Sequence, residues 1–341
     1  MNKIIEPVNL CFVTDDCYAM PTCVAMTSAI MNKNPGTFYN IYVLCNGVSL
    51  EKKQKILELK NPEVAIKIID VDNKEDYSGF KIEGITATPT SIYKFYIPTM
   101  LKNVDKIIFI DCDTIIQGGL SDLYNINLGD NLVGSVKNPS RLMRQKPELS
   151  KRCKYFNSGV MLMNLNAMRE YDCPEKMMEY RRTGFNRLMD QDAINATVKS
   201  RVKMLPFKYN TMVGVVTANL FWSNGESLEN IKEAWGINKK FSVEDIISNA
   251  VILHYYAAAK PWKYYDSYGN DIWYRYYILS PYGNIPLIRK SHYLEKTAKS
   301  KSYMVGEAVV KVLKKMKVEK KTREDKQYEK FLESFCEDGT F

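Results

Sequence analysis

Histidine is nearly missing from this chain: His254 and His292 are the only two among 341 residues. Imidazole is the side chain most often used for proton transfer near neutral pH, and it is the commonest metal ligand. Any chemistry that depends on imidazole must therefore pass through one of these two residues.

Long apolar runs and paired cysteines are also missing. No apolar run reaches the roughly 18 residues that a membrane-spanning helix needs, and residues 1–7 lack the apolar stretch of a signal peptide. The eight cysteines are scattered without a C-x-x-C pair, and several, such as Cys11 and Cys45, stand within apolar runs. We therefore expect reduced thiols and a cytoplasmic protein.

Negative charge is scarce toward the C-terminus, where residues 289–330 hold 14 Lys and Arg against 6 Asp and Glu. This surplus of eight accounts for nearly all of the net charge of +9. The rest of the chain is close to neutral, which argues against nucleic acid as a partner. We expect a catalytic domain over residues 1–285 and a basic helical extension over residues 286–341.

The extension has a helical pattern of its own. Apolar residues recur at helical spacing over residues 303–318, and lysines occupy the same turns. This is the composition of a helix that lies at a membrane interface. It predicts reversible contact with an anionic membrane, on the inner face of the plasma membrane. The alternative is a helix that packs on the body of the protein with its lysines toward water.

The first 115 residues alternate between predicted strands and helices. Strands are predicted over residues 8–14, 41–45, 64–69 and 107–110, and helices over 21–31, 50–59 and 90–96, the last ending before Pro98. This alternation predicts an α/β fold with a parallel sheet covered by helices. Later strands are predicted over 132–136, 156–165 and 251–254, with a helix over 166–182 and a long exposed loop over 137–154.

The most informative stretch is residues 106–114, where four apolar residues run directly into Asp111-x-Asp113. Ligands of open α/β sheets bind beyond the carboxyl ends of the strands. Two carboxylates are costly to hold together there unless a cation neutralises them. A divalent cation would do so and could also hold a phosphate. An acidic turn without a ligand is the plain alternative.

Other polar groups also follow or interrupt apolar runs. Asp15 and Tyr18 come after the first predicted strand, where a carboxylate and a ring suit a nucleotide base. Asn157 stands within an apolar strand, and sugar hydroxyls would suit a buried amide, whose isolation costs about 1–3 kcal/mol. Asp190 and Gln191 begin a predicted helix. Each also fits an ordinary role as a helix cap, a packed ring or an amide bonded to nearby backbone.

His254 ends a predicted strand and precedes a turn that contains Lys260. Imidazole together with carboxylates suits Mn²⁺ better than Mg²⁺. His254 could therefore complete a site with Asp111 and Asp113, and Lys260 lies within loop reach of a pyrophosphate held there. A structural histidine at a strand end is the alternative.

The order of these motifs resembles glycosyltransferase family 8 over about residues 9–262. The motifs are T-D-D-x-Y at 14–18, I-D-x-D at 110–113, Y-F-N-S-G at 155–159, D-Q-D at 190–192, and H-Y followed by K-P-W within 254–262. The resemblance implies a GT-A fold, a Rossmann-like, nucleotide-binding mixed sheet flanked by helices. It also implies a retaining transfer of glucose or galactose from a UDP-hexose to a saccharide or lipid-linked glycan, dependent on Mn²⁺ with Mg²⁺ as a substitute. Bacterial relatives of this kind build lipopolysaccharide or surface polysaccharide.

The resemblance also implies a role for each matching residue. Asp111, Asp113 and His254 would bind manganese, and Asp15 and Tyr18 would hold the uracil. The rest of the donor site would be formed by Lys94, Cys112, Asn157, Asp190, Gln191 and Lys260, the last of these contacting the phosphates. Gln191 and Asp190 are the expected catalytic residues. Gln191 is expected near the reacting carbon in a positioning role, with attack from the same face through an oxocarbenium-like state.

Three positions depart from the pattern: Lys94 replaces a frequent Arg, Cys17 a frequent Asn and Ala257 a Gly. None removes a metal ligand, so an active enzyme is expected, with a non-catalytic nucleotide-sugar-binding protein as one alternative. The other is a haloacid-dehalogenase-type phosphatase, since F-I-D-x-D-T at 109–114 fits its nucleophile motif. The loop over 137–154 and the aromatic-rich stretch 262–282 are expected to shape the acceptor site, with ordinary packing as the alternative for the rings.

Overall fold

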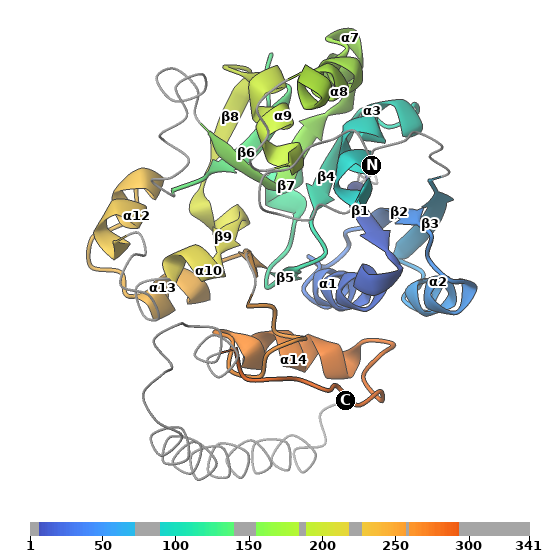
Figure 1. Ribbon diagram of the computed structural model, residues 1–341, viewed down its shortest axis with the longest axis vertical. Helices are drawn as coiled ribbons and strands as arrows, with labels where there is room; N and C mark the ends of the chain where they lie inside the picture. The colour runs from blue at the N-terminus through green and yellow to red at the C-terminus, as the bar shows by residue number, and fades with distance from the viewer. Residues whose placement is uncertain are drawn as a thin grey trace, which may run out of the picture. The chain divides into compact units, whose positions relative to one another are not determined.

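The computed structural model describes residues 7–71, 89–139, 155–183, 189–217, 227–256 and 259–292 (Figure 1). The chain divides into two compact units, Met1–Arg289 and Lys290–Phe341. The fold reported below is that of the first unit. The basic helix predicted over 303–318 and most of the loop predicted over 137–154 lie outside the described residues. Within the described ranges, no helix is long and apolar enough to cross a bilayer.

Seven strands form the main sheet, in the order β3-β2-β1-β4-β7-β6-β8. They are β1 (Val8–Asp15), β2 (Tyr39–Asn46), β3 (Val64–Asp70), β4 (Lys106–Ile110), β6 (Val133–Lys137), β7 (Phe156–Asn164) and β8 (Val202–Leu205). The first four strands of that order run parallel to one another. β7 runs antiparallel to both β4 and β6, so the sheet is mixed, as the resemblance implied.

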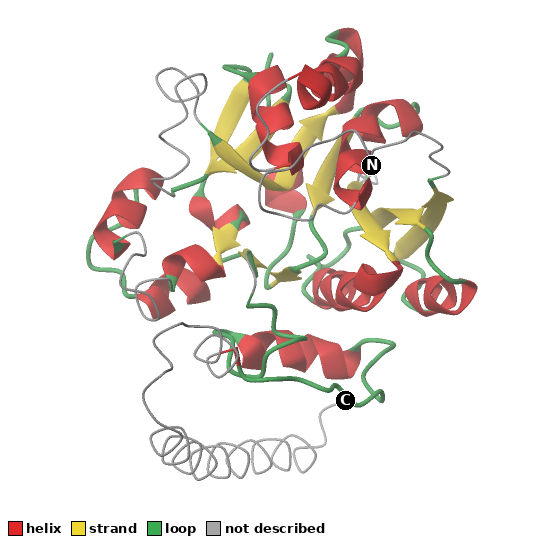
Figure 2. Cartoon of the chain, in the orientation of Figure 1, coloured by secondary structure: helices red, strands yellow, loops and turns green. Residues whose placement is uncertain are grey.

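Helices occupy most of the connections between these strands (Figure 2). Among the described residues, the α-helices are α1 (Ala19–Met31), α2 (Leu50–Leu57), α3 (Ile97–Met100), α4 (Ser121–Tyr124), α7 (Leu165–Glu170), α8 (Cys173–Thr183), α9 (Met189–Val198), α10 (Val213–Val216), α12 (Leu228–Trp235), α13 (Val243–Ser248) and α14 (Asn270–Leu279). Short 3-10 helices span Asp16–Tyr18, Pro89–Tyr96 and Phe207–Tyr209.

Strand β4 is buried on both faces, which explains its unbroken apolar sequence. Ile108 and Ile110 pack into one core cluster with residues of α1 such as Met26. Ile107 and Phe109 point to the opposite face, where they join a second cluster that includes residues of α3, α7, α8 and α9. Burying a side chain of this size stabilises the fold by roughly 1.5–3 kcal/mol. The strand that carries Asp111 at its end is therefore firmly fixed.

A second, three-stranded sheet brings the histidine to the acidic pair. It consists of β5 (Thr114–Ile116), β10 (Ile252–His254) and β9 (Thr211–Met212), with β10 in the middle. His254 lies opposite Thr114 in the antiparallel β5–β10 ladder. The backbone N–H of Tyr255 donates to the carbonyl of Asp113 at 2.8 Å. Sheet register, rather than sequence proximity, thus places His254 beside Asp113.

Two predicted helices differ from those observed. The helix predicted over 166–182 is two helices, α7 and α8, separated at Tyr171 and Asp172. Asp172 has a left-handed φ of 55°, and Pro174 has no N–H to continue the hydrogen bonds of a single helix. The helix predicted over 90–96 is a 3-10 helix that continues into α3, where Pro98 lies in the first turn. The end predicted before Pro98 agrees with the end of the 3-10 helix at Tyr96. Pro98 is tolerated in α3 because the first turn of a helix needs no N–H from proline.

Candidate functional site

Asp111 and Asp113 lie at the carboxyl end of β4, where the chain turns into β5. The N–H of Asp111 donates to the carbonyl of Gly159 at 2.7 Å, which extends the β4–β7 pairing by one residue. The hydroxyl of Thr114 then donates to the carbonyl of Asp111 at 2.9 Å and closes the turn. The expected position beyond a strand's carboxyl end is confirmed for both acids.

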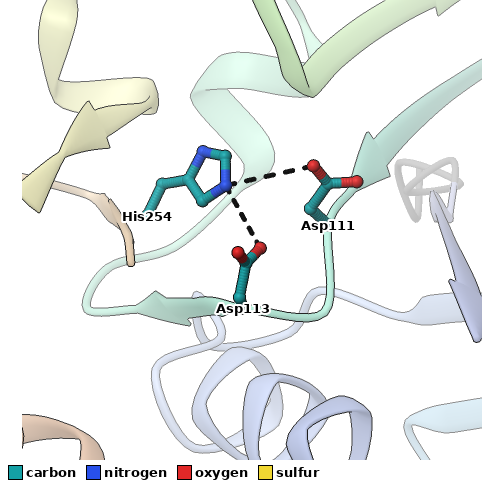
Figure 3. Close-up of side chains that lie close together, drawn as sticks. All are labelled: Asp111, Asp113 and His254. Atoms are coloured by element: carbon teal, nitrogen blue, oxygen red, sulfur yellow. Dashed lines mark ion pairs between the residues drawn. The ribbon is translucent and has the colours of Figure 1, made fainter. Parts of the chain in front are cut away.

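Asp111, Asp113 and His254 form a group that could hold a metal ion (Figure 3). One potential ligand atom from each lies within 4.8 Å of the other two. His254 Nε2 is 3.1 Å from Asp113 Oδ1 and 3.9 Å from Asp111 Oδ2. Two carboxylates and an imidazole are a donor set that divalent first-row metals accept.

Gly159 makes this close arrangement of side chains feasible. A β-carbon at this position would lie 2.3 Å from His254 Cε1 and 2.8 Å from Asp111 Oδ2. Both distances are shorter than real contacts allow, so only glycine leaves room for the imidazole and the carboxylate here. The sequence pattern N-S-G at 157–159 thus has a steric reason.

The pKa values of Asp111 and Asp113 are shifted in opposite directions. Burial raises the pKa of Asp111 above its ordinary value and outweighs the opposing influence of Lys94. Burial acts in the same sense on Asp113, but Lys260 and His254 outweigh it and hold the pKa of Asp113 well below its ordinary value. Asp111 therefore carries its charge at a cost in free energy that a bound cation would relieve.

Lys94 bridges the acidic pair and a second acid on α9. Its Nζ lies 2.7 Å from Asp190 Oδ2 and 3.3 Å from Asp111 Oδ1, with only 5% of the side chain exposed. Although burial works against the charged form, these two carboxylates raise the pKa of Lys94. Lys94 therefore stays positively charged and links the β4 turn to α9.

Lys260 lies on the opposite side of Asp113. Its Nζ forms an ion pair with Asp113 Oδ2 and donates to the carbonyl of Tyr255 at 2.9 Å. The side chain of Lys260 is 12% exposed. Because it is paired with Asp113, a second ammonium group lies next to the candidate metal site.

The amide groups of Asn157 and Gln191 are directed at each other. Asn157 Nδ2 donates to Gln191 Oε1 at 2.9 Å, and Gln191 Nε2 donates to the hydroxyl of Tyr155 at 3.0 Å. Asp190 is held by Lys94 and by the hydroxyl of Ser158 at 2.8 Å. The structure thus gathers these predicted donor-sugar residues next to Asp111, with their polar groups already bonded within the protein.

Asp15 and Tyr18 lie at the carboxyl end of β1. Because β1 runs parallel to β4, they are on the same side of the sheet as Asp111 and Asp113. Asp15 caps the following 3-10 helix by accepting from the N–H of Tyr18 at 3.0 Å, and it also accepts from Thr90 Oγ1 at 3.0 Å. The ring of Tyr18 packs edge-on against Trp262, with centroids 5.8 Å apart. Burial, followed by the negative charge of Asp113, raises the pKa of Tyr18, which places this ring near the acidic pair.

Cys112, between the two acids, turns its side chain toward the sheet. Its Sγ donates to the carbonyl of Val13 at 3.0 Å, and 6% of the residue is exposed. Burial raises the pKa of this thiol, so it offers no reactive group. Cys17 is exposed, and Ala257 lies outside the described residues.

Most of the rings expected to shape an acceptor site belong to the core instead. Trp262, Trp273, Tyr276, Tyr277 and Tyr282 are all buried members of one hydrophobic cluster. Ordinary packing, the alternative interpretation, accounts for these five rings. Rings with one polar atom are large apolar groups first, and a sequence pattern does not separate a packed ring from a displayed one.

One site residue escaped the sequence interpretation altogether. Asn210, which precedes β9, is fully buried and contacts both Asn157 and His254. The sequence does hold one indication that Asn210 is buried, because this amide has Tyr209, Met212 and other apolar residues as sequence neighbours. Its partners depend on the β9–β10 pairing, which the sequence does not reveal.

Comparison with known proteins decides the family. Residues 9–266 match the family model described as "Glycosyl transferase family 8". The chain belongs to glycosyltransferase family 8. It is therefore an enzyme of that family, and the phosphatase and the non-catalytic binding protein are both wrong.

Two curated relatives match most of the chain. The chain is 23% identical over 267 residues to "General stress protein A" of Bacillus subtilis (strain 168), covering 76% of this chain and 88% of that protein. It is 22% identical over 285 residues to "Lipopolysaccharide 1,2-glucosyltransferase" of Escherichia coli (strain K12), covering 79% and 77%.

A solved structure of the galactosyltransferase LgtC, in complex with donor and acceptor sugar analogs, shares the fold. Its TM-score with this chain is 0.66 at 24% sequence identity, and the match covers 82% of this chain and 98% of LgtC. The GT-A fold inferred from the sequence is thereby confirmed.

Proposed function

We propose that this family 8 enzyme transfers glucose or galactose from a UDP-sugar to a saccharide or lipid-linked glycan acceptor, with retention of anomeric configuration and dependence on Mn²⁺. The observation that carries the proposal is the group Asp111, Asp113 and His254 at the carboxyl end of β4, flanked by the buried ammonium of Lys94 and by Lys260.

The residues present fit a divalent cation. Asp111 shares Lys94 with Asp190, and burial raises the pKa of Asp111, so a cation would relieve an existing cost. The imidazole favours Mn²⁺ over Mg²⁺, which prefers oxygen ligands and retains its water. A bound metal of this kind would offset the negative charge that develops on the departing pyrophosphate.

The chain's own cations would act in the same place. Lys260 stands beside Asp113, within reach of phosphates that lie at the acidic pair, and a fixed ammonium in a partly buried site stabilises developing negative charge. The ammonium group of Lys94 forms ion pairs with both Asp111 and Asp190. This link would keep the sugar-binding acid in register with the metal ligands.

The donor sugar and its base would lie on either side of the acidic pair. Asp190, Gln191 and Asn157 would surround the sugar, and Asp15 with Tyr18 would hold the uracil. Asp190 is already bonded to Lys94 and to Ser158, which favours a positioning role over nucleophilic attack. This supports same-face attack through an oxocarbenium-like state, with Gln191 near the reacting carbon.

The relatives support a hexose donor and a glycan acceptor. One is a lipopolysaccharide glucosyltransferase and another a galactosyltransferase. We extend from them to a bacterial lipopolysaccharide or surface polysaccharide as the product. Domain boundaries at 1–285 and 286–341, and peripheral contact of the basic extension with the inner face of the plasma membrane, remain part of this proposal.

A thermal-shift screen of nucleotide sugars tests the donor directly. We expect UDP-glucose or UDP-galactose to raise the melting temperature in the presence of Mn²⁺ and to raise it much less in chelator. GDP-mannose serves as the control with the wrong base. Equal shifts for all nucleotide sugars, or shifts unaffected by chelator, would contradict the proposal.

A further inference from the structure

The buried amide of Asn210 lies between the candidate metal site and the candidate sugar site. Its side chain has no exposure, and it contacts Asn157 Oδ1 at 2.8 Å on one side and His254 Nδ1 at 3.0 Å on the other. We propose that Asn210 is a positioning residue that fixes a proton on Nδ1 of His254 and so presents Nε2 to the metal.

Asn210 belongs to a series of hydrogen bonds that runs from Gln191 through Asn157 to His254. The direction of each of these bonds follows from two backbone N–H groups of β7. The N–H of Gly159 can only donate, and it faces Asn157 at 2.9 Å, so the atom that it meets is Oδ1. The N–H of Ser158 faces Gln191 at 3.2 Å, so that atom is Oε1. Asn157 Nδ2 therefore donates to Gln191, and the orientation of both amides is determined.

The orientation then passes from Asn157 to the histidine. Asn157 Oδ1 can only accept, so the atom of Asn210 that faces it is Nδ2. The remaining atom, Asn210 Oδ1, therefore faces His254 Nδ1. Because a carbonyl oxygen cannot donate, Nδ1 must carry the hydrogen.

This arrangement leaves the other ring nitrogen for the metal. Nε2 of His254 is the atom directed at Asp113 and Asp111. In metal-ligating histidines, a hydrogen bond to the second ring nitrogen fixes the tautomer and the ring orientation, and its loss typically weakens metal binding by about 10- to 100-fold. Asn210 supplies that hydrogen bond here, and through Asn157 the same chain reaches Gln191.

The experiment reads the tautomer and the metal affinity separately. ¹⁵N-histidine-labelled protein has only two imidazole rings, and His292→Gln assigns them. In alkaline, metal-free buffer, where an imidazole ordinarily carries one proton, we expect that proton on Nδ1 of His254. A proton on Nε2 instead would overturn the proposal without the need for any variant to fold.

Substitutions of Asn210 test its role toward Mn²⁺, measured by electron paramagnetic resonance titration of the metal alone. Asn210→Leu should lose the tautomer preference and bind Mn²⁺ about 10- to 100-fold more weakly. Asn210→Asp still accepts from Nδ1 and should retain the tautomer. It should bind Mn²⁺ more tightly than Asn210→Leu, although its second carboxyl oxygen meets the acceptor Asn157 Oδ1 and loses that hydrogen bond. Thr211→Val, which removes a part-buried hydrogen bond to the carbonyl of Phe207 on the same segment, is the matched control and should behave like the wild type.

The inference rests on the proposed metal site, and the two can fail separately. If the wild type binds no Mn²⁺ but His254 shows the expected tautomer, the proposed metal function fails and the positioning of His254 stands. If the wild type binds Mn²⁺ and Asn210→Leu binds it equally well, the positioning role is overturned. Equal weakening by Asn210→Leu, Asn210→Asp and Thr211→Val would also overturn it, because local destabilisation would then explain the loss.

Discussion

Gly159 and His254 are packed so closely that a β-carbon on residue 159 would lie 2.3 Å from the imidazole Cε1. The contact joins β7 of the main sheet to β10 of the small sheet. It means that the position of the candidate metal ligand depends on a backbone atom of another strand.

Gly159→Ala should therefore impair metal-dependent activity. The added methyl group must displace His254 or Asp111, and overpacking of this kind costs about 1–3 kcal/mol. We expect Mn²⁺-dependent cleavage of a UDP-hexose to fall roughly tenfold or more, since 1.36 kcal/mol corresponds to a factor of ten in rate. Gly118→Ala is the matched control, because its β-carbon would meet only Val251 at an ordinary 3.6 Å. Equal activity of the two variants would refute the steric role of Gly159.

The two aspartates should affect stability in opposite directions. Because burial raises the pKa of Asp111, its ionised form destabilises the metal-free fold at neutral pH. Asp111→Asn should therefore melt at a higher temperature than the wild type in chelator at pH 7. This advantage should fade as the pH falls and the wild-type carboxyl takes up a proton.

Asp113→Asn should melt at a lower temperature under the same conditions. The pKa of Asp113 is held below its ordinary value of 3.8 by Lys260 and His254, so its stabilising charge is present at neutral pH and is lost only in acid. Removing one partner of a buried ion pair costs roughly 3 kcal/mol. A lower melting temperature for Asp111→Asn than for Asp113→Asn would contradict this assignment.

How far the sequence predicts the fold depends on whether the determining contacts are local. The apolar run of β4 and its terminal acids are local features, and both were predicted from the residues alone. The break between α7 and α8 was missed because helical periodicity on either side outweighed the signal from Asp172 and Pro174. The resemblance to family 8 supplied the GT-A fold and the mixed sheet.

Within the site, residues that belong to a sequence motif could be predicted. Residues that reach the site only through the register of paired strands could not. His254 could be named because only two histidines are available and because it matches the family pattern. Asn210 could not, since its contacts with Asn157 and His254 require β9 and β10 to pair in one particular register. The burial of Trp273 and Tyr277 likewise depends on how α14 packs against the rest of the core, which amino-acid composition does not specify.

Tyr18 should contribute to donor affinity through its ring. Stacking of a base on an aromatic side chain is worth about 1–3 kcal/mol, so Tyr18→Ala should raise the KM for UDP-hexose roughly five- to 150-fold while kcat changes little. Tyr18→Phe keeps the ring and its contact with Trp262 and should stay near the wild type. A fall in kcat with KM unchanged would show that Tyr18 does not hold the base.

The basic C-terminal segment should bind anionic vesicles. Each lysine near an anionic leaflet contributes about 1 kcal/mol before salt screening, so the full chain should sediment with anionic vesicles at low salt and be released at high salt. A chain that lacks residues 300–341 should remain in the supernatant, and neutral vesicles provide the control. Equal, salt-insensitive recovery of both chains would mean that the segment has a structural role only.

Cleavage of UDP-glucose and UDP-galactose, measured as UDP release with Mn²⁺ or with excess chelator, is the decisive test of the metal site. We expect that the wild type releases UDP only with the metal, that Asp113→Ala abolishes this activity, and that His254→Ala severely reduces it. His292→Ala, which changes the only other histidine, should behave like the wild type. Full activity in chelator, or in the His254→Ala variant, would contradict the assignment of Asp111, Asp113 and His254 as the metal site.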